Sequence, residues 1–235
     1  MSATMLRWWG VVPAAGCGAR MEADIPKQYL SIGGETLLSR SVKRLLKLSR
    51  LEQIVVAVDR DDERWYQLPV MSDLRVKVVI GGAERAESVL VGLLALTNAH
   101  DDDWVMVHDA ARPCVRSSAM RKMLDTLAND PVGGIMALPV ADTLKQSNSV
   151  QKISKTIDRR GLWAAQTPQL FRLGLLRKAL QQAQAKGTSV TDEASAMEQA
   201  GHVPRLYLGS SHNIKITHTE DLELAALILE AQGNG

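Results

Sequence analysis

The sequence predicts an α/β fold built on one open, mostly parallel twisted sheet, and two observations lead to this prediction. Short apolar runs alternate with longer segments whose apolar residues recur at helical spacing, which is the pattern of strand–helix units. The apolar runs are also continuously hydrophobic, as is typical of parallel strands covered on both faces. In such a Rossmann-like sheet, ligands bind beyond the carboxyl ends of the strands.

The first half of the chain carries most of the expected sheet. Strands are predicted at 8–13, 53–58, 76–80, 104–108 and 134–139. Amphipathic segments follow the second and third of these strands, at 61–67 and 84–96. In the segment 84–96, Val89, Leu93 and Leu96 share one face of a helix.

The alternation of strands and helices breaks down between residues 142 and 160, where the chain is polar and has no core-facing period. We predict a two-stranded β-arm that turns near 147–149, because long loops without structure are uncommon in compact domains. The alternative is a mobile surface loop. An isolated hairpin buries too little surface to be stable, so the arm predicts a homodimer in which two copies pack together.

The C-terminal third returns to regular structure. A helix is expected at 173–186, ended by Gly187, and Thr191 is predicted to be the N-cap of a shorter helix that Gly201 ends. A strand at 203–208 and a helix at 219–231 follow. The chain is therefore predicted to form a single domain over 1–235, with the arm at 142–160 inserted in it.

Charge and cysteine content exclude several classes of protein. The chain has 28 Lys and Arg against 26 Asp and Glu, a net charge of +2, which is too low for a protein that coats nucleic acid. Cys17 and Cys114 stand in different motifs without metal-ligand spacing, which favours two reduced thiols over a disulfide or a structural zinc site. Gly10 and Pro13 interrupt the N-terminal apolar stretch, and no stretch reaches the length of a membrane span, so we expect a cytoplasmic protein without membrane contact.

The strongest chemical signal is a strand that ends in small residues, Val-Val-Pro-Ala-Ala-Gly-Cys-Gly-Ala-Arg-Met at 11–21, followed by Pro-Lys-Gln-Tyr at 26–29. Small residues leave backbone N–H groups uncovered, so an anion such as a triphosphate can approach the main chain, with Arg20 and Lys27 supplying charge. The segment matches neither the Walker pattern nor the dinucleotide-binding pattern. Taken alone, it fits equally well a tight turn with two solvated cations.

Two further loops follow strands at the same edge of the predicted sheet. The segment 81–85 precedes a helix that bears Ser88, so N–H groups and a hydroxyl are available to the polar edge of a base. In the segment 108–113, Asp109 and Arg112 follow the fourth strand and are either ligand-binding residues or a local ion pair. His108 is expected to be a partly buried structural histidine without a catalytic role.

In combination, these motifs resemble the family of 2-C-methyl-D-erythritol 4-phosphate cytidylyltransferases, which are of the nucleotidyltransferase type. The resemblance extends over nearly the whole chain. The matching positions are 13–16 with Gly18 and Arg20, 26–29, 81–82 with 84–85 and Ser88, 108–113, 142–143, 158–159 with 161–163, 166–169, 191–194 and 213–215.

The resemblance implies a Mg²⁺-dependent transfer of CMP from CTP to the phosphate of 2-C-methyl-D-erythritol 4-phosphate, in non-mevalonate isoprenoid precursor biosynthesis. The attacking phosphate oxygen is already ionised at neutral pH, so the reaction needs no general base. It needs positive charge around the α-phosphorus. The metal ion is then expected to be held mainly by the CTP phosphates.

The resemblance also assigns residue roles. Arg20 and Lys27 would stabilise the transition state over the CTP phosphates, while Arg159 and Lys215 would position the acceptor phosphate. Arg159, at the end of the arm, would complete the site of the neighbouring subunit. The residues implied in CTP binding are Pro13, Ala14, Ala15, Gly16, Gly18, Gly82, Ala83, Ser88, Asp109 and Ala110. Those implied in acceptor binding are Asp109, Arg112, Thr143, Arg159, Thr167, Thr191 and Lys215.

The chain departs from the family pattern at Ala83, where many relatives carry Asp. A side-chain acceptor for the cytosine amino group is therefore absent there, and backbone carbonyls must take its place. Two other functions remain open at this point: a cytidylyltransferase for ribitol 5-phosphate, which would differ in the acceptor pocket, and a non-catalytic nucleotide-binding module. The presence of Arg20, Lys27, Arg159 and Lys215 together favours an enzyme, because binding alone does not require cations on both anionic substrates.

Overall fold

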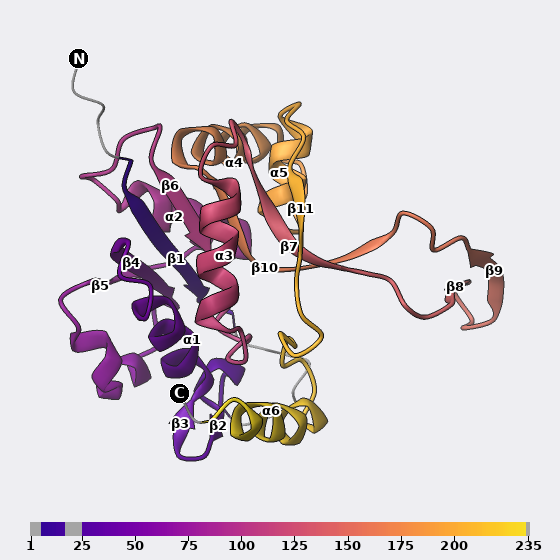
Figure 1. Cartoon of the computed structure of the whole chain (residues 1–235), viewed down its shortest axis with the longest axis horizontal. Coiled ribbons are helices and arrows are strands. Elements are labelled where there is room, and N and C mark those ends of the chain that lie inside the picture. The colour runs from indigo at the N-terminus through magenta and orange to yellow at the C-terminus, as the bar shows by residue number, and fades with distance from the viewer. Residues whose placement is uncertain (1–5, 17–24, 234–235) are drawn as a thin grey trace.

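The computed structural model describes residues 6–16 and 25–233. Within them, a central sheet has seven strands in the order β11-β7-β10-β6-β1-β4-β5 (Figure 1). Strand β10 runs antiparallel to both of its neighbours, and all other pairs in this sheet are parallel. The strands are β1 (Trp8–Ala14), β4 (Leu51–Val58), β5 (Val76–Ile80), β6 (Trp104–Val107), β7 (Gly133–Pro139), β10 (Trp163–Arg172) and β11 (Arg205–Leu208).

Helices cover both faces of the sheet. The helices are α1 (Leu37–Leu46), α2 (Arg85–Leu94), α3 (Ser117–Leu127), α4 (Leu173–Lys186), α5 (Glu193–Gln199) and α6 (Glu220–Ala231). Apolar residues of α1 and α3 share one buried cluster with Val12, whereas those of α2, α4 and α5 share another with the adjacent Val11. Because successive side chains of a strand point to opposite faces, a strand covered on both sides must be apolar throughout.

A third cluster lies at one end of the molecule (Figure 1). There α6 packs on Leu37 and on the small hairpin formed by β2 (Ser31–Ile32) and β3 (Glu35–Thr36). Cys114 is a free cysteine buried in this cluster, and burial raises the pKa of its thiol to about 11, so it is uncharged at neutral pH. Cys17 lies outside the described residues.

The mostly parallel α/β sheet is confirmed, and all the predicted strands are present, β5 with the predicted ends and the others with one or both ends shifted. The sequence analysis missed β10, because its polar residues and Pro168 break any apolar run, and it assigned neither α1 nor α3. The helix expected at 61–67 is wrong. The chain instead forms two short 3-10 turns, η3 (Arg64–Gln67) and η4 (Pro69–Ser72). Side chains at the start of this segment compete with helical hydrogen bonds, since Asp59 Oδ1 accepts from Asp61 N–H at 2.9 Å and Asp62 Oδ1 accepts from Arg64 N–H at 3.1 Å.

The N-cap of α5 is also corrected. Asp192, not Thr191, occupies that position, and its carboxylate accepts a hydrogen bond from the Ser195 backbone N–H at 2.9 Å. The Thr191 hydroxyl lies 3.3 Å from the Ser195 hydroxyl instead. A carboxylate at the N-cap also interacts favourably with the helix dipole.

Strands β8 (Leu144–Ser147) and β9 (Ile153–Ile157) form an antiparallel hairpin that projects from the body (Figure 1). At its tip the Asn148 side chain accepts hydrogen bonds from the backbone N–H groups of Val150 and Lys152, at 3.1 and 2.9 Å. The two-stranded arrangement is therefore present. Its role in dimerisation, and the assignment of 1–235 to a single domain with 142–160 inserted, stay predictions. In the described part of the chain, no helix combines the length and apolar character needed to cross a membrane.

Candidate active site

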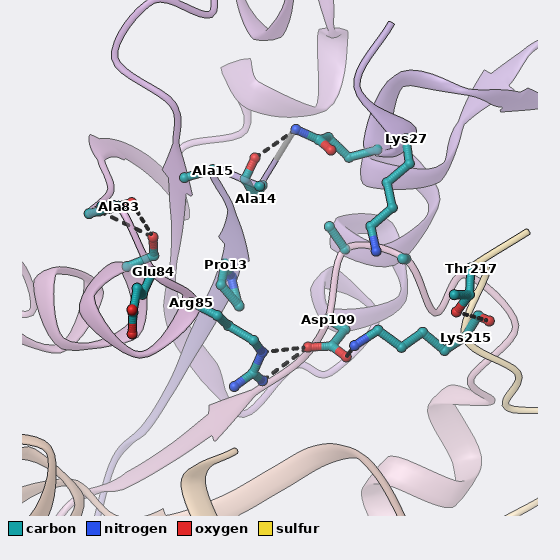
Figure 2. A pocket seen from close by; sticks show the side chains of 16 residues that line it. Pro13, Ala14, Ala15, Lys27, Ala83, Glu84, Arg85, Asp109, Lys215 and Thr217 are labelled. Carbon is teal, nitrogen blue, oxygen red and sulfur yellow. Dashed lines mark hydrogen bonds and ion pairs between the residues drawn. The ribbon is translucent and has the colours of Figure 1, made fainter. Parts of the chain in front are cut away.

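A cavity of about 340 Å³ opens where loops leave the carboxyl ends of β1 and β6 (Figure 2). Residues 13–16 end β1 and form one wall, and residues 109–111 follow β6. The loop 82–85 before α2 forms a second wall. Lys27, from the 3-10 turn η2 (Lys27–Tyr29), and Lys215, before α6, point into the cavity. The site thus lies at the edge where parallel sheets bind ligands.

The loop at 81–84 packs closely against the end of β1. A Cβ at Gly81 would lie 2.7 Å from Ser88 Oγ and 2.9 Å from Ala15 Cβ, so only glycine fits there. The loop is also hydrogen-bonded to its own helix, since Gly82 N–H donates to Ser88 Oγ at 3.1 Å and Ala83 N–H donates to Glu87 Oε2 at 2.9 Å. The loop is therefore fixed on its own helix, and it lies close against the wall formed by the end of β1.

Asp109 is the centre of a buried ion cluster at the floor of the cavity, with only 7% of its surface exposed. Its Oδ1 accepts from Arg85 Nε at 3.0 Å, and its Oδ2 lies 3.0 Å from Lys215 Nζ (Figure 2). The same Oδ2 lies 3.7 Å from Arg112 Nε. Burial opposes ionisation of this carboxyl, but the three cations outweigh burial and lower the pKa of Asp109 well below its usual range.

Arg85 connects this cluster to a second carboxylate. Its Nη1 and Nη2 donate to the two oxygens of Glu193 at 2.6 and 3.0 Å. Burial alone would lower the pKa of Arg85, but Glu193 and Asp109 raise it above its ordinary value. With Arg112 and Lys215 included, three cations face two carboxylates, so the cluster keeps a net positive charge that suits a phosphate-bearing ligand.

Behind Asp109, a chain of hydrogen bonds fixes its backbone. Asp109 N–H donates to Thr167 Oγ1 at 2.9 Å, and Thr167 Oγ1 lies 3.1 Å from His108 Nδ1. His108 Nε2 lies 3.1 Å from the carbonyl oxygen of Arg112. Because a carbonyl only accepts, Nε2 carries the proton and Nδ1 accepts from the threonine hydroxyl. His108 is thus a buried structural histidine, and burial lowers its pKa to about 4.

Comparison with known proteins identifies the family. The family described as IspD, 2-C-methyl-D-erythritol 4-phosphate cytidylyltransferase, matches residues 9–231. The chain belongs to this family.

Two curated members of this cytidylyltransferase family and one solved structure are similar to this chain over almost their full length. The protein of that name from Pseudomonas entomophila (strain L48) is 51% identical over 225 residues, covering 95% of this chain and 96% of the relative. The one from Serratia proteamaculans (strain 568) is 48% identical, covering 95% and 94%. The crystal structure of the Francisella tularensis enzyme superimposes with a TM-score of 0.84 at 36% identity, covering 95% of this chain and 100% of that one.

The structure brings most of the residues implied by the cytidylyltransferase resemblance into one cavity. Those that line it are Pro13, Ala14, Ala15, Gly16, Lys27, Gly82, Ala83, Ser88, Asp109, Ala110 and Lys215. Gly18 and Arg20 lie outside the described residues. Their predicted roles stay predictions.

The remaining residues implied in acceptor binding do not line the cavity of their own chain. Arg112 and Thr167 are buried next to it, and Arg112 Nη1 donates to the carbonyl oxygen of Asn213 at 2.7 Å. Thr143 and Arg159 are exposed near the base of the hairpin, and Thr191 is exposed just before α5. The roles of these residues in binding stay predictions.

Sequence reasoning assigned no role to three polar residues that shape the site. Gln28 is buried, and its Nε2 donates to the carbonyl oxygen of Ala14 at 2.8 Å, which ties η2 to the end of β1. Arg85 and Glu193 form the ion cluster described above. Gln28 and Arg85 stood in the quoted motifs, but nothing local indicates that their partners are 14 and 24 residues away.

The cavity offers few ligands for a metal ion. Among the described residues that line the cavity, the acidic ones are Glu84 and Asp109. Both carboxylate oxygens of Asp109 already contact cations. Within residues 6–16 and 25–233, no three His, Cys, Asp or Glu side chains are grouped as a metal site. This arrangement fits a Mg²⁺ ion held through substrate phosphates better than one held in a protein cage.

The buried His108 predicts a pH-dependent stability. Between pH 6.5, the ordinary pKa of histidine, and about pH 4, the unfolded chain binds a proton at this position and the folded chain does not. The free energy of unfolding therefore decreases as the pH is lowered through this window. The expected loss in the free energy of unfolding is up to about 3 kcal/mol. Urea unfolding of wild type and His108→Gln across this window measures it. Identical pH slopes for the two proteins would contradict the expectation.

Proposed function

We propose that the cavity catalyses the reaction for which its family is named, making 4-diphosphocytidyl-2-C-methyl-D-erythritol from CTP and 2-C-methyl-D-erythritol 4-phosphate in isoprenoid precursor biosynthesis. The observation that carries this proposal is the convergence of three main-chain loops with Lys27 and Lys215 on one cavity (Figure 2). Uncovered N–H groups and lysines suit a triphosphate, and the loop at 82–88 suits a base edge.

The chemistry follows from charge. An oxygen of the acceptor phosphate attacks the α-phosphorus of CTP, and the bond from that phosphorus to the bridging oxygen breaks, so the electron pair leaves with pyrophosphate. The nucleophile is already ionised, and no residue need remove a proton. Lys27 and Lys215 point into the cavity from the side that faces the loop with Ala83 and Glu84, and there they offset the charge that two anions bring together (Figure 2). Asp109 holds Lys215 in place.

We further infer that Mg²⁺ takes part. Bound to the triphosphate, the ion would neutralise charge on the leaving pyrophosphate. Glu84 and Asp109 are the nearest carboxylates of the cavity wall, and the contacts of Asp109 with three cations favour coordination through phosphate and water.

We also infer a homodimer. The hairpin exposes apolar side chains, with Val150 and Ile153 each 67% accessible, and a free hairpin of this kind is only marginally stable. A second copy would cover these residues. In that arrangement Thr143 and Arg159 would reach the cavity of the neighbouring subunit, which suits their exposure in a single chain. No nucleic-acid or membrane partner is proposed, and a cytoplasmic location suits the CTP substrate and the buried thiol of Cys114.

A pyrophosphate-release assay tests the reaction and the acceptor together. With CTP and Mg²⁺, we expect release with 2-C-methyl-D-erythritol 4-phosphate to exceed that with ribitol 5-phosphate by at least about 10-fold in kcat/KM, since a site built for one set of hydroxyls leaves polar groups unpaired with another. EDTA should abolish the release. A preference for ribitol 5-phosphate would overturn the acceptor assignment. Binding of CTP without release in the presence of either acceptor would favour a non-catalytic module.

A further inference from the structure

Glu193 does not line the cavity, yet it is bound to a side chain that does. It is the first residue of α5, and only 1% of its surface is exposed. Both of its carboxylate oxygens accept from Arg85, at 2.6 and 3.0 Å. A paired, two-point contact of this kind fixes the plane of the guanidinium as well as its position.

Arg85 connects Glu193 to Asp109, the carboxylate that contacts Lys215 at the cavity. It is the first residue of α2, directly after the loop 82–84, and its Nε and Nη2 both lie 3.0 Å from Asp109 Oδ1 (Figure 2). The other oxygen of Asp109 is then left for Lys215 Nζ, also at 3.0 Å. Glu193, Arg85, Asp109 and Lys215 thus form one continuous chain of ion pairs.

The sheet itself fixes the backbone around Glu193. Gln169 of β10 is buried, and its Oε1 accepts from Ala194 N–H at 2.9 Å while its Nε2 donates to Asp192 Oδ2 at 2.9 Å. The residues on both sides of Glu193 are therefore held by one side chain from the central sheet. Glu193 is a rigid anchor rather than a flexible surface carboxylate.

The charge balance indicates what Glu193 does. Without its carboxylate, the partly buried Arg85 guanidinium would have Asp109 as its remaining anionic partner in the cluster and would draw that carboxylate toward itself. Lys215 and Arg85 would then compete for the same oxygens. Lys215 would lose the contact that holds its ammonium group at the cavity wall.

We propose that Glu193 is a positioning residue for CMP transfer, which holds Arg85 so that Asp109 stays shared between Arg85 and Lys215. The inference rests on the proposed function, because it concerns the placement of Lys215 for the transfer step. The hydrogen bonds of the loop at 82–84 run to Ser88 and Glu87 and do not involve the Arg85 side chain. The loop that is proposed to hold the base therefore keeps its own hydrogen bonds without Glu193, and we expect Glu193 to act mainly through the placement of Lys215.

The first test is Glu193→Gln, which has nearly the same shape but no charge. We expect kcat to fall about 10-fold, the usual effect of losing a charged hydrogen bond that acts in the transition state, while the Kd for CTP changes by less than about threefold. Steady-state pyrophosphate release and titration with CTP measure the two quantities. Glu198→Gln is the matched control, because Glu198 is an exposed residue of the same helix, and it should behave as wild type.

A double-mutant cycle with Arg85→Gln separates positioning from a merely structural role. If Glu193 acts through Arg85, the double variant should be no slower than Arg85→Gln alone, whereas independent effects would multiply. Glu193→Asp, which keeps the charge but shortens the reach, should lie between wild type and Glu193→Gln. If thermal unfolding shows that Glu193→Gln does not fold, Glu193→Asp takes its place in the test. The inference then requires that Glu193→Asp lower kcat relative to wild type while the Kd for CTP stays nearly unchanged.

Three results would overturn the inference. One is a folded Glu193→Gln variant whose kcat is within about twofold of the wild-type value, because losing a charged hydrogen bond should lower kcat by much more. Another is a multiplicative cycle with Arg85→Gln. A third is a loss confined to CTP affinity. A wild-type chain that binds CTP but transfers no CMP would overturn the proposed function as well, so the two failures are distinguishable.

Discussion

Lys27→Ala should lower kcat by about 10²-fold or more, which is the usual cost of removing one group that stabilises charge in a transition state. Lys27 points into the cavity from η2, on the same side as Lys215, and the triphosphate is expected to lie there (Figure 2). The added negative charge at the α-phosphorus would then lose one of the cations that offset it. Pyrophosphate release at saturating CTP and acceptor measures the effect.

The control for this variant is Lys186→Ala, at the exposed end of α4, which should keep wild-type turnover. The resemblance to the family predicts a loss of the same size for Arg20→Ala, although Arg20 lies outside the described residues. Near-normal turnover in both Lys27→Ala and Arg20→Ala would remove these residues from the mechanism.

Mixing two inactive variants should restore activity if each site is shared between subunits. Arg159→Ala and Lys27→Ala are each expected to be nearly inactive. After subunit exchange at equal concentrations, half of the dimers are hybrids, and one of the two sites in each hybrid regains both residues. The mixture should therefore recover about one quarter of wild-type activity.

The control is the same mixture before exchange, or one in which both partners carry Lys27→Ala, and neither should recover. Exchange is followed independently with differently tagged subunits. Hybrids that form without any recovery would show that Arg159 acts in its own subunit or takes no part in the reaction. A chain that stays monomeric at assay concentration would contradict the dimer itself.

The sequence alone predicted the fold class and most of the cavity wall. Parallel strands covered on both faces must be apolar at every position, as Val11 and Val12 are, and this leaves a local signal in the chain. The loops after β1 and β6 carry small residues and an acid at the edge where such sheets bind ligands, so Ala14, Gly16 and Asp109 were predictable as cavity residues.

Some features of secondary structure escaped prediction because they depend on neighbours rather than on local pattern. Strand β10 carries Gln166, Thr167 and Gln169 in its middle and is stabilised by pairing with β6 and β7 on either side. A 3-10 turn at 64–67 replaced the helix expected at 61–67, where the side chains of Asp59 and Asp62 accept hydrogen bonds from nearby backbone N–H groups.

What the sequence by itself determined is therefore the layered α/β architecture and the set of loops that meet at one edge of the sheet. Only the tertiary structure decided how their side chains pair. Asp109, Arg85 and Glu193 come from three separate segments, with Arg85 and Glu193 108 residues apart, and no periodicity links them. Ion pairs form between groups that the packed sheet brings within about 3 Å of each other, and that proximity depends on the topology of the whole chain rather than on any local run of residues.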